Sequence, residues 1–312
     1  MKSLLVTGAS GFLGSWVSEV AHAQGYELLG VDIVAPRHPE WFAGFSMHPS
    51  DWVDYGSLVD GRRLSGVLHL AGAASVPQSV ENPVGDFASL LPGTVSLLAY
   101  LAKHQPGAHV VLFSSAAVYG NPQRLPISEE DEVAPISPYG IHKAAAEFLV
   151  RHYARLAGLP ATVLRIFSAY GEGLRKQVVW DLCQRVIVAL RRGSREIQLH
   201  GTGSETRDFI HAGDVARGAM AALENPPASG FQVLNVASGE ETSIRQLAES
   251  ICGSLGADVA LSFDGIVRKG DPVNWRADVA KLTAIGFAPA LPLERGIAQC
   301  VRWQRSLADF AD

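Results

Sequence analysis

Residues 1–14 read MKSLLVTGASGFLG and join an apolar run to three evenly spaced glycines. The run Leu4–Val6 is typical of a buried strand, and helical periodicity begins after the glycines. Gly8 allows a sharp turn, Gly11 lets the backbone approach a pyrophosphate, and Gly14 lets helix and strand pack closely. The free N–H groups at the start of such a helix favour phosphate. An ordinary glycine-rich turn is the alternative, but the spacing favours a phosphate-binding turn.

An acidic residue follows the second predicted strand. This strand covers Glu27–Val31 and is followed by Asp32, which lies about twenty residues beyond the glycines, as in dinucleotide-binding folds. A carboxylate at this position accepts hydrogen bonds from an adenosine ribose and repels a 2′-phosphate. We therefore predict NAD rather than NADP as the cofactor. The alternative is that Asp32 is only a turn residue before Pro36.

The composition restricts the class of protein. The chain has 312 residues, of which 47% are hydrophobic and 18% charged, and its formal net charge is -5. This length exceeds that of a usual single domain, so two lobes are expected. The negative charge argues against nucleic acid or an anionic membrane as a partner.

The cysteines and the apolar segments bear on the compartment. The chain has three cysteines, Cys183, Cys252 and Cys300. Their odd number and wide spacing predict buried thiols, no metal site and a reducing compartment. The apolar N-terminus breaks at Thr7, too early for a signal peptide. Because Pro92 interrupts the apolar segment 89–102, no membrane span is predicted, and we expect a cytoplasmic protein.

Strands and helices alternate through the first half of the chain. Gly66–Leu70 predicts a strand, Pro83–Lys103 a helix, and His109–Phe113 another strand. Such repeated βαβ units imply an α/β fold with a parallel, doubly wound sheet and right-handed crossovers, the Rossmann architecture. Ala71 and Gly72 follow the first of these strands and leave room for a flat ring, in the crevice where such sheets bind ligands.

Two later segments supply side chains suited to proton transfer. Ser115 lies at the exit of the strand that begins at His109, and therefore at the same edge of the sheet. Ser137 is a plausible N-cap with Pro138 at the first helical position. Tyr139 and Lys143 consequently lie one turn apart on one face of the following helix.

This spacing has a chemical rationale. A phenol with a pKa of about 10 is a poor base at neutral pH, but a nearby ammonium and a positive nicotinamide ring favour the phenolate. Tyr139 could then take a proton from a carbinol whose carbon gives hydride to NAD, with Ser115 hydrogen-bonded to the same oxygen. The alternative is a packing pair with an extended lysine beside an ordinary serine-rich turn.

Together these motifs resemble the extended short-chain dehydrogenase/reductases of the nucleotide-sugar epimerase type. The resemblance extends over nearly the whole chain. It continues through the segments Arg165–Gly171, Gly201–Gly203, Arg207–His211, Asp214–Ala216, Asn235–Gly239 and Arg268–Pro272.

The resemblance implies an NAD-binding domain over residues 1–167, with a returning segment around 205–237. Residues 168–312 would form most of a smaller C-terminal α/β substrate-binding lobe. The implied cofactor contacts are Gly8, Ser10, Gly11, Phe12, Leu13, Gly14, Asp32, Asp51, Leu70, Ala71, Gly72, Ser114, Tyr139 and Lys143. The implied substrate contacts are Ser75, Ser115, Ser168, Arg207, Arg268 and Asp271. The substrate would be a nucleoside-diphosphate sugar, with a UDP-sugar favoured, and the helices 83–103 and 139–157 would pair two subunits in a homodimer.

Several positions depart from the family pattern. Ser168 replaces an asparagine that contacts substrate phosphate, Glu172 replaces a proline, and Leu90 lies where asparagines often support the active site. The 4,6-dehydratases of the family carry an Asp-Glu pair where this chain has Ala116 and Ala117. Because alanine cannot transfer a proton, the sequence argues against dehydration.

Three functions remain open at this point. An epimerase would oxidise the sugar at C4 and return hydride to the opposite face. A reductase would reduce a 4-keto-6-deoxy sugar with NAD(P)H, and a non-catalytic nucleotide-binding module would keep only the fold.

Other polar groups receive a structural interpretation: the run 129–132 is expected to be solvated. The histidines expected at the surface or in loops are His22, His38, His48, His104, His109 and His200.

Overall fold

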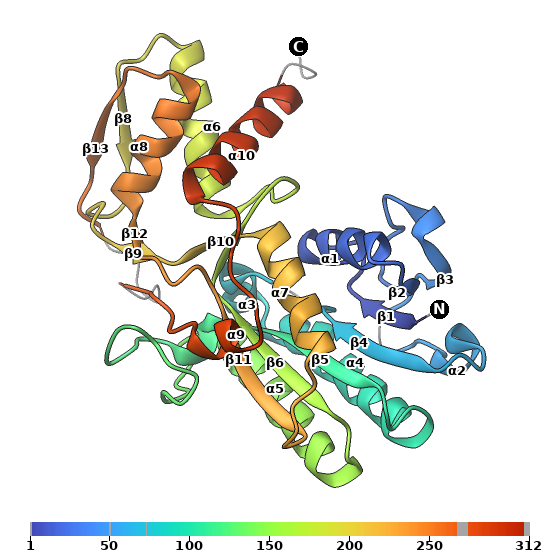
Figure 1. Cartoon of the computed structure of the whole chain (residues 1–312). Coiled ribbons are helices and arrows are strands. Elements are labelled where there is room, and N and C mark those ends of the chain that lie inside the picture. Colours follow the sequence, from blue (N-terminus) through green and yellow to red (C-terminus); the bar gives the residue numbers. More distant parts are fainter. Residues whose placement is uncertain (1, 50, 73, 267–273, 309–312) are drawn as a thin grey trace.

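A sheet of seven parallel strands lies at the centre of the computed structural model, which describes residues 2–49, 51–72, 74–266 and 274–308 (Figure 1). The strand order is β11-β6-β5-β4-β1-β2-β3. In that order the strands cover Phe231–Val236, Ala161–Ile166, His109–Ser115, Leu64–His69, Ser3–Thr7, Glu27–Val31 and Phe42–Ser46. The predicted doubly wound sheet is confirmed.

The register brings the ends of the central strands together. Thr7 at the end of β1 is paired with Val31 of β2 on one side and with His69 of β4 on the other. From β1 the chain adds β2 and β3 on one side of the sheet and then β4, β5 and β6 on the other side, so the strand order reverses at β1. Ligands of open parallel sheets bind at such a reversal, outside the carboxyl ends of the strands.

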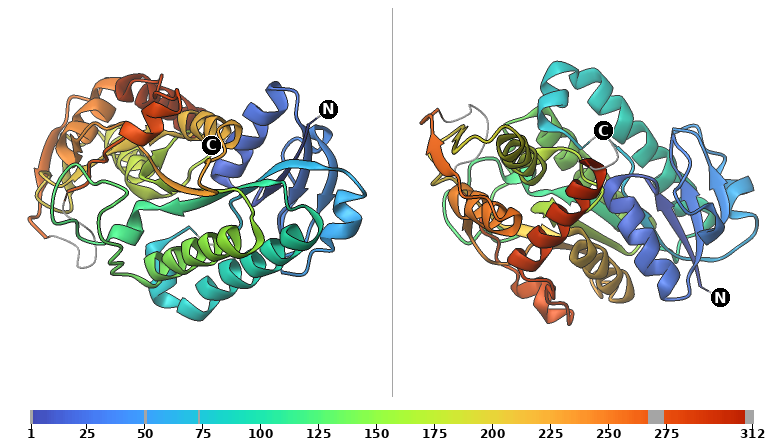
Figure 2. Two further views of the ribbon diagram at one scale, coloured as in Figure 1. Left: turned by 60° about the horizontal axis from the view of Figure 1, so that its bottom comes forward. Right: turned by 90° about the horizontal axis from the view of Figure 1, so that it is seen from above.

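Helices cover both faces of the sheet (Figure 2). Because side chains alternate along a strand, Leu4 and Val6 of β1 pack toward α1 and α7, while Leu5 packs toward α2, α4 and α5. These helices cover Phe12–Ala23 (α1), Ala212–Glu224 (α7), Tyr55–Val59 (α2), Pro83–His104 (α4) and Pro138–Ala157 (α5). The strands are buried on both faces, which explains their continuous apolar runs.

A second layered unit carries the three cysteines. Helices α6 (Gln177–Arg191), α8 (Ile244–Leu255) and α10 (Leu293–Ala308) pack together beside the parallel pair β8 (Glu196–Leu199) and β13 (Ala260–Phe263) (Figure 1). All three thiols are free and buried, as predicted.

Short elements connect the two parts. Strand β7 (Ser168–Tyr170) pairs with β10 (Phe209–His211), and β9 (Thr206–Arg207) pairs with β12 (Thr242–Ser243). The remaining elements are the helices α3 (Val76–Glu81) and α9 (Ala280–Ala284) and the 3-10 turns η1 (Pro39–Trp41) and η2 (Ala116–Tyr119).

Helix α5 begins where its sequence predicts. The Ser137 hydroxyl accepts a hydrogen bond from the Gly140 N–H, and Pro138 occupies the first turn. Proline fits there because the N–H it lacks would have no intrahelical partner. The cap fixes the start of the helix and therefore the direction in which Tyr139 projects.

One expectation about β5 was wrong, and the expectation that no segment spans a membrane stays a prediction. Helix α4 is long and apolar enough by composition to cross a membrane, despite Pro92, and in this fold its apolar face packs against the sheet and α5. His109 is buried at the start of β5, where its ring nitrogens bond the Leu223 carbonyl and the Thr162 hydroxyl, both at 2.9 Å. Burial lowers the pKa of His109, which keeps the ring neutral.

Candidate active site

The glycine-rich turn connects β1 to α1 and tolerates no larger residue at its closest contacts. A Cβ built on Gly14 would lie 1.9 Å from the Gly8 carbonyl oxygen, and one built on Gly8 would lie 2.8 Å from the Ala71 nitrogen. Gly8 also has a φ of +71°, which L-residues rarely adopt. Gly11 is the N-cap of α1 and has no side chain to cap it. The first N–H groups of α1 are thus presented at the sheet edge, next to the half-buried Phe12 and Leu13.

Asp32 lies directly above this turn at the end of β2. Its Oδ2 accepts the Ser10 N–H at 2.9 Å, and its Oδ1 accepts the N–H groups of Ile33 at 2.7 Å and Val34 at 3.3 Å. Asp32 therefore caps a local turn, as the alternative interpretation of this residue predicts. Its carboxylate lies beside the glycines, as the spacing predicts.

The residues after β4 lie next to the end of β1, on the side away from β2. The Leu70 N–H donates to the Thr7 carbonyl at 3.0 Å, and the Ala71 N–H donates to the Thr7 hydroxyl at 3.3 Å. A Cβ built on Gly72 would lie 3.2 Å from Cβ of Leu90 on α4. These small residues and the glycine turn therefore meet at one edge. Asp51 is exposed, in the segment that precedes α2.

Tyr139, Lys143 and Ser115 meet at the end of β5. Nζ of Lys143 lies 5.9 Å from the centroid of the Tyr139 ring, and it donates a hydrogen bond to the Phe113 carbonyl at 2.9 Å. The Ser115 hydroxyl accepts the Ala117 N–H at 3.2 Å, and it lies close enough to the Tyr139 phenol to lower the pKa of that group. The helix α5 and the strand β5 thus bring together the three residues selected from the sequence, which we call the acid–base group.

The electrostatics of this group differ from the expectation. Burial raises the pKa of Tyr139 to about 12; the Ser115 hydrogen bond lowers it in part, and the Asp86 carboxylate raises it. Burial lowers the pKa of Lys143 to about 8, against the opposing effects of Asp86 and Glu147. The side chains alone therefore do not produce the depressed phenol pKa that the Tyr–Lys spacing predicts, because desolvation outweighs the hydrogen bond.

The substrate residues named from the resemblance fall in different places. Ser75 caps α3 by accepting the Gln78 N–H at 3.3 Å, while Ser168 begins β7. Arg207 is half-buried in β9, and its guanidinium lies 5.8 Å from the Trp275 ring centroid. Arg268 and Asp271 lie outside the described residues.

Glu172, the unusual carboxylate, is bonded within the fold. His211 uses Nδ1 to accept the Gly213 N–H at 3.1 Å, so Nε2 carries the proton and donates to Glu172 at 3.1 Å. The backbone oxygen of Glu172 also accepts the Trp16 indole N–H at 3.1 Å. This bonding ties the segment after β7 to α1.

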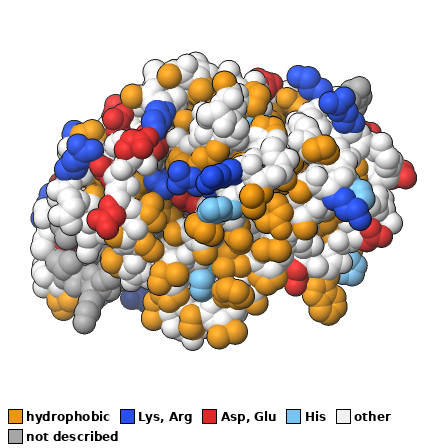
Figure 3. Space-filling model, turned by 90° about the horizontal axis from the view of Figure 1, so that it is seen from below, with side chains coloured by type: hydrophobic (Ala, Val, Ile, Leu, Met, Phe, Trp, Pro, Cys, Tyr) orange, Lys and Arg blue, Asp and Glu red, His pale blue; other side chains and the backbone are white. Residues whose placement is uncertain are grey.

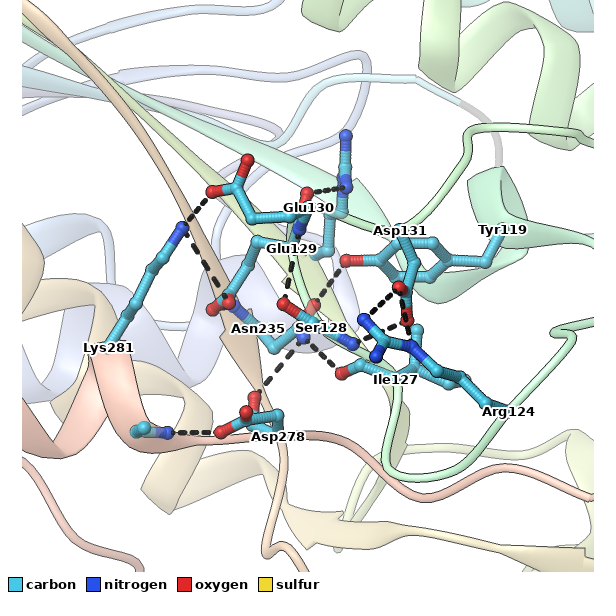
Figure 4. A network of polar contacts seen from close by, with 12 residues as sticks. Tyr119, Arg124, Ile127, Ser128, Glu129, Glu130, Asp131, Asn235, Asp278 and Lys281 are labelled. Atoms are coloured by element: carbon cyan, nitrogen blue, oxygen red, sulfur yellow. Dashed lines mark hydrogen bonds and ion pairs between the residues drawn. The ribbon is translucent and has the colours of Figure 1, made fainter.

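Sequence reasoning missed a buried polar network behind the acid–base group. The Ser114 hydroxyl donates to the Glu147 carboxylate, which also receives the Arg165 guanidinium. The expectation of a solvated run 129–132 was wrong for Glu129, which is buried and accepts the Asn235 N–H at 2.8 Å (Figure 4). The wide spacing of these residues in the chain gave no signal, although a hydroxyl and a charged pair in buried strands and helices could have suggested partners.

Among the residues that the structure describes, no group of three or more His, Cys, Asp or Glu side chains is placed to hold a metal ion. The polar groups at the sheet edge are instead hydroxyls, a phenol, an ammonium and backbone N–H groups. They are suited to holding a phosphorylated ligand and to moving a proton on an alcohol.

Comparison with known proteins places this geometry among sugar-nucleotide enzymes. A model of the NAD-dependent epimerase/dehydratase family matches residues 4–237. The UDP-glucose 4-epimerase of Mycolicibacterium smegmatis is 32% identical over 316 residues, covering 97% of this chain and 98% of the relative.

Two solved structures share the fold. The crystal structure of UDP-glucose 4-epimerase from Thermotoga maritima with UDP-glucose matches with a TM-score of 0.85 at 29% identity, covering 98% of this chain and 99% of that one. The Thermus thermophilus UDP-glucose 4-epimerase in complex with NAD matches with a TM-score of 0.83 at 28% identity, covering 97% and 99%.

Proposed function

We propose that this protein, which belongs to the NAD-dependent epimerase/dehydratase family, is a 4-epimerase of a nucleoside-diphosphate sugar. A UDP-sugar is the favoured substrate, because the similar enzymes named above act on UDP-glucose. The observation that carries the proposal is the meeting of Ser115, Tyr139 and Lys143 at the sheet edge that also holds the glycine turn. An alcohol and a dinucleotide can be held together only at such a place.

The residues at this edge fit NAD. The turn at Gly8 and Gly14 has no room for a Cβ, as expected where a backbone must lie close to a pyrophosphate. Asp32 is a hydrogen-bond acceptor for the adenosine ribose, and its charge disfavours a 2′-phosphate. NAD bound there would accept hydride from the sugar carbon and give it back.

Tyr139 is the proposed base and acid. As a phenolate it takes the proton of the sugar C4 hydroxyl, and as a phenol it gives that proton back when the alcohol is restored. Ser115 donates a hydrogen bond to the same oxygen, and the Lys143 ammonium favours the phenolate. Because the pKa of Tyr139 is raised to about 12, chiefly by burial, the positive charge of an oxidised nicotinamide ring would be the group that lowers it when the cofactor is bound.

Epimerisation is tested directly with the purified protein. We expect the denatured protein to release NAD, detected by ultraviolet absorbance. We also expect the native protein to interconvert UDP-glucose or UDP-N-acetylglucosamine with its C4 epimer without added NADPH. Consumption of NADPH by a 4-keto-6-deoxy sugar, without interconversion, would instead establish the reductase. If the protein shows neither activity, the remaining interpretation is a non-catalytic nucleotide-binding module.

We further propose a homodimer formed through α4 and α5. Hydrophobic side chains gather over the face seen from below (Figure 3), and both helices lie at the bottom of Figure 1. The large apolar side chains that these two helices expose include Val84, Phe87, Val95, Ile141 and Phe148. Phe148 is 61% exposed in the monomer, which is unusual for a phenylalanine unless a partner covers it.

Replacement of Phe148 with glutamate is expected to give a monomer. A buried aromatic anchor at an interface contributes about 2 kcal/mol, and an unpaired carboxylate opposes association further. Sedimentation velocity measures the change. The control is Ile266→Glu, an equally exposed apolar residue (65%) after β13 and away from the two helices, which should leave the dimer intact. A wild-type protein that sediments as a monomer would contradict the proposal.

The compartment remains a prediction. The free, buried cysteines agree with a reducing environment, and we propose the cytoplasm.

A further inference from the structure

Glu147 lies on α5 one turn beyond Lys143 and is buried behind the acid–base group. Its Oε1 accepts a hydrogen bond from the Ser114 hydroxyl. Nε of Arg165 lies 3.2 Å from each carboxylate oxygen, and Nη2 lies 2.8 Å from Oε2. The guanidinium thus binds the carboxylate side-on, the geometry that most strictly fixes both groups.

This bonding joins α5 to the exit of β5 at two points. Lys143 donates to the Phe113 carbonyl, and one helical turn later Glu147 accepts from Ser114. Ser115 is the next residue and the last one of β5. Because the two residues are adjacent in the chain, a shift of Ser114 away from α5 would also displace Ser115 relative to Tyr139.

We propose that Glu147 is a positioning residue, whose carboxylate holds the exit of β5 against the helix that carries the acid–base group. This inference rests on the proposed function. Glu147 acts through Ser114 and through its charge.

The charges around Glu147 are arranged so that its own charge is balanced. Arg165, from β6, supplies the positive partner, and its guanidinium lies 4.7 Å from the centroid of the Tyr119 ring. The guanidinium also donates to the Glu129 carbonyl at 3.2 Å. Lys143 from α5 and Asp86 from α4 lie nearby, Asp86 is bonded to His142, and the Glu129 carboxylate acts with Glu147 on Tyr119. Removal of either member of the Glu147–Arg165 pair leaves the other charge unbalanced beside Lys143.

A second network fixes the outer side of this pair. The Tyr119 hydroxyl donates to the Asn235 side chain at 2.7 Å, and the backbone N–H of Asn235 donates to the Glu129 carboxylate (Figure 4). Arg165 therefore cannot follow a displaced carboxylate without breaking bonds to η2 and to the segment before α5. A pair that served stability alone would not need to be attached to the residue before Ser115.

The test compares two variants whose charge effects have opposite signs. Glu147→Gln leaves Arg165 unbalanced, which favours phenolate and moves the Tyr139 titration to lower pH. Arg165→Met leaves the carboxylate unbalanced and moves the titration to higher pH. Glu147→Gln is also expected to lower kcat by about 10- to 100-fold with little change in KM, because a misplacement near 1 Å has that effect.

Two measurements read out these shifts. The pH profile of kcat reports them during turnover. An ultraviolet titration of phenolate in the purified enzyme, with Tyr139→Phe as the reference, reports them without turnover. If the wild type epimerises nothing, the titration still reports whether the charges of Glu147 and Arg165 act on Tyr139, so failure of the proposed function is recognised separately.

Two further variants complete the experiment. Ser114→Ala keeps the ion pair and removes only the contact to the strand, so kcat should fall while the titration stays in place. It also decides the matter if Glu147→Gln does not fold. Asp214→Asn is the control, because Asp214 is another buried carboxylate paired with an arginine, Arg217, on the opposite face of the sheet. Folded Glu147 and Ser114 variants with wild-type kcat, or a titration shift shared with Asp214→Asn, would overturn the proposal.

Discussion

Replacement of Tyr139 with phenylalanine is expected to lower kcat by about 10³-fold, because the proposed base and acid is removed while the ring remains. Tyr139 is half-buried, its pKa responds to the Ser115 hydroxyl, and Lys143 lies beside the ring. Burial lowers the pKa of the neighbouring Lys143 to about 8. Once the phenol oxygen is removed, Lys143 cannot take the proton of the sugar hydroxyl in its place. Initial rates of C4 interconversion, measured by separation of the two epimers, give kcat.

A control separates chemistry from folding. Tyr153 lies on the same helix and is half-buried in the core between the sheet and α5. Tyr153→Phe removes the same atom at a distance from the acid–base group and should keep nearly full activity. Both variants should release as much NAD as the wild type. A Tyr139→Phe protein with undiminished kcat would remove the proposed mechanism.

Replacement of Gly14 with alanine is expected to abolish retention of NAD and to destabilise the fold by about 3 kcal/mol through overpacking. The added Cβ would lie 1.9 Å from the Gly8 oxygen and 2.9 Å from the Gly8 carbonyl carbon. Because both atoms belong to the backbone, the clash is relieved only if α1 moves away from the turn that holds the phosphates. Thermal unfolding and the NAD content of the purified protein measure the two effects.

Gly253→Ala is the matched control, and its expected sign is opposite. Gly253 lies in helix α8, it is exposed, and no described atom lies within 4 Å of a Cβ built on it. Alanine should stabilise an exposed helical position by about 0.5–1 kcal/mol. A Gly14→Ala variant that unfolds at the wild-type temperature and retains NAD would contradict the close packing of α1 on the turn.

Local patterns were sufficient to predict the sheet and the main elements of the site. The glycine spacing, Asp32 after β2, and the capped start of α5 each depend on residues close together in the chain, where steric and hydrogen-bonding rules act directly. Ser115 and Tyr139 could be placed together because parallel strands and their following helices share one edge.

The errors concern partners that only the folded chain provides. Glu129 was expected in water as part of an acidic run, but the N–H of Asn235, from β11, makes its burial possible. His109 was taken for a surface residue because its two partners, Leu223 and Thr162, come from α7 and β6. The pKa of Tyr139 was expected to be lowered by Lys143, yet the depth of burial, which spacing does not reveal, dominates.

The path of the chain has a consequence for how the protein can be dissected. Strand β11 is paired with β6, and α7 packs on α1, although each partner lies far away in the sequence. A gene fragment ending after β6 would encode six adjacent strands. In that fragment β6 would lack its partner β11, and α1 would lack the helix α7 that packs on it. The part of the chain that carries the glycine turn therefore cannot be excised as a self-sufficient unit, because later residues supply its last strand and the helix beside α1.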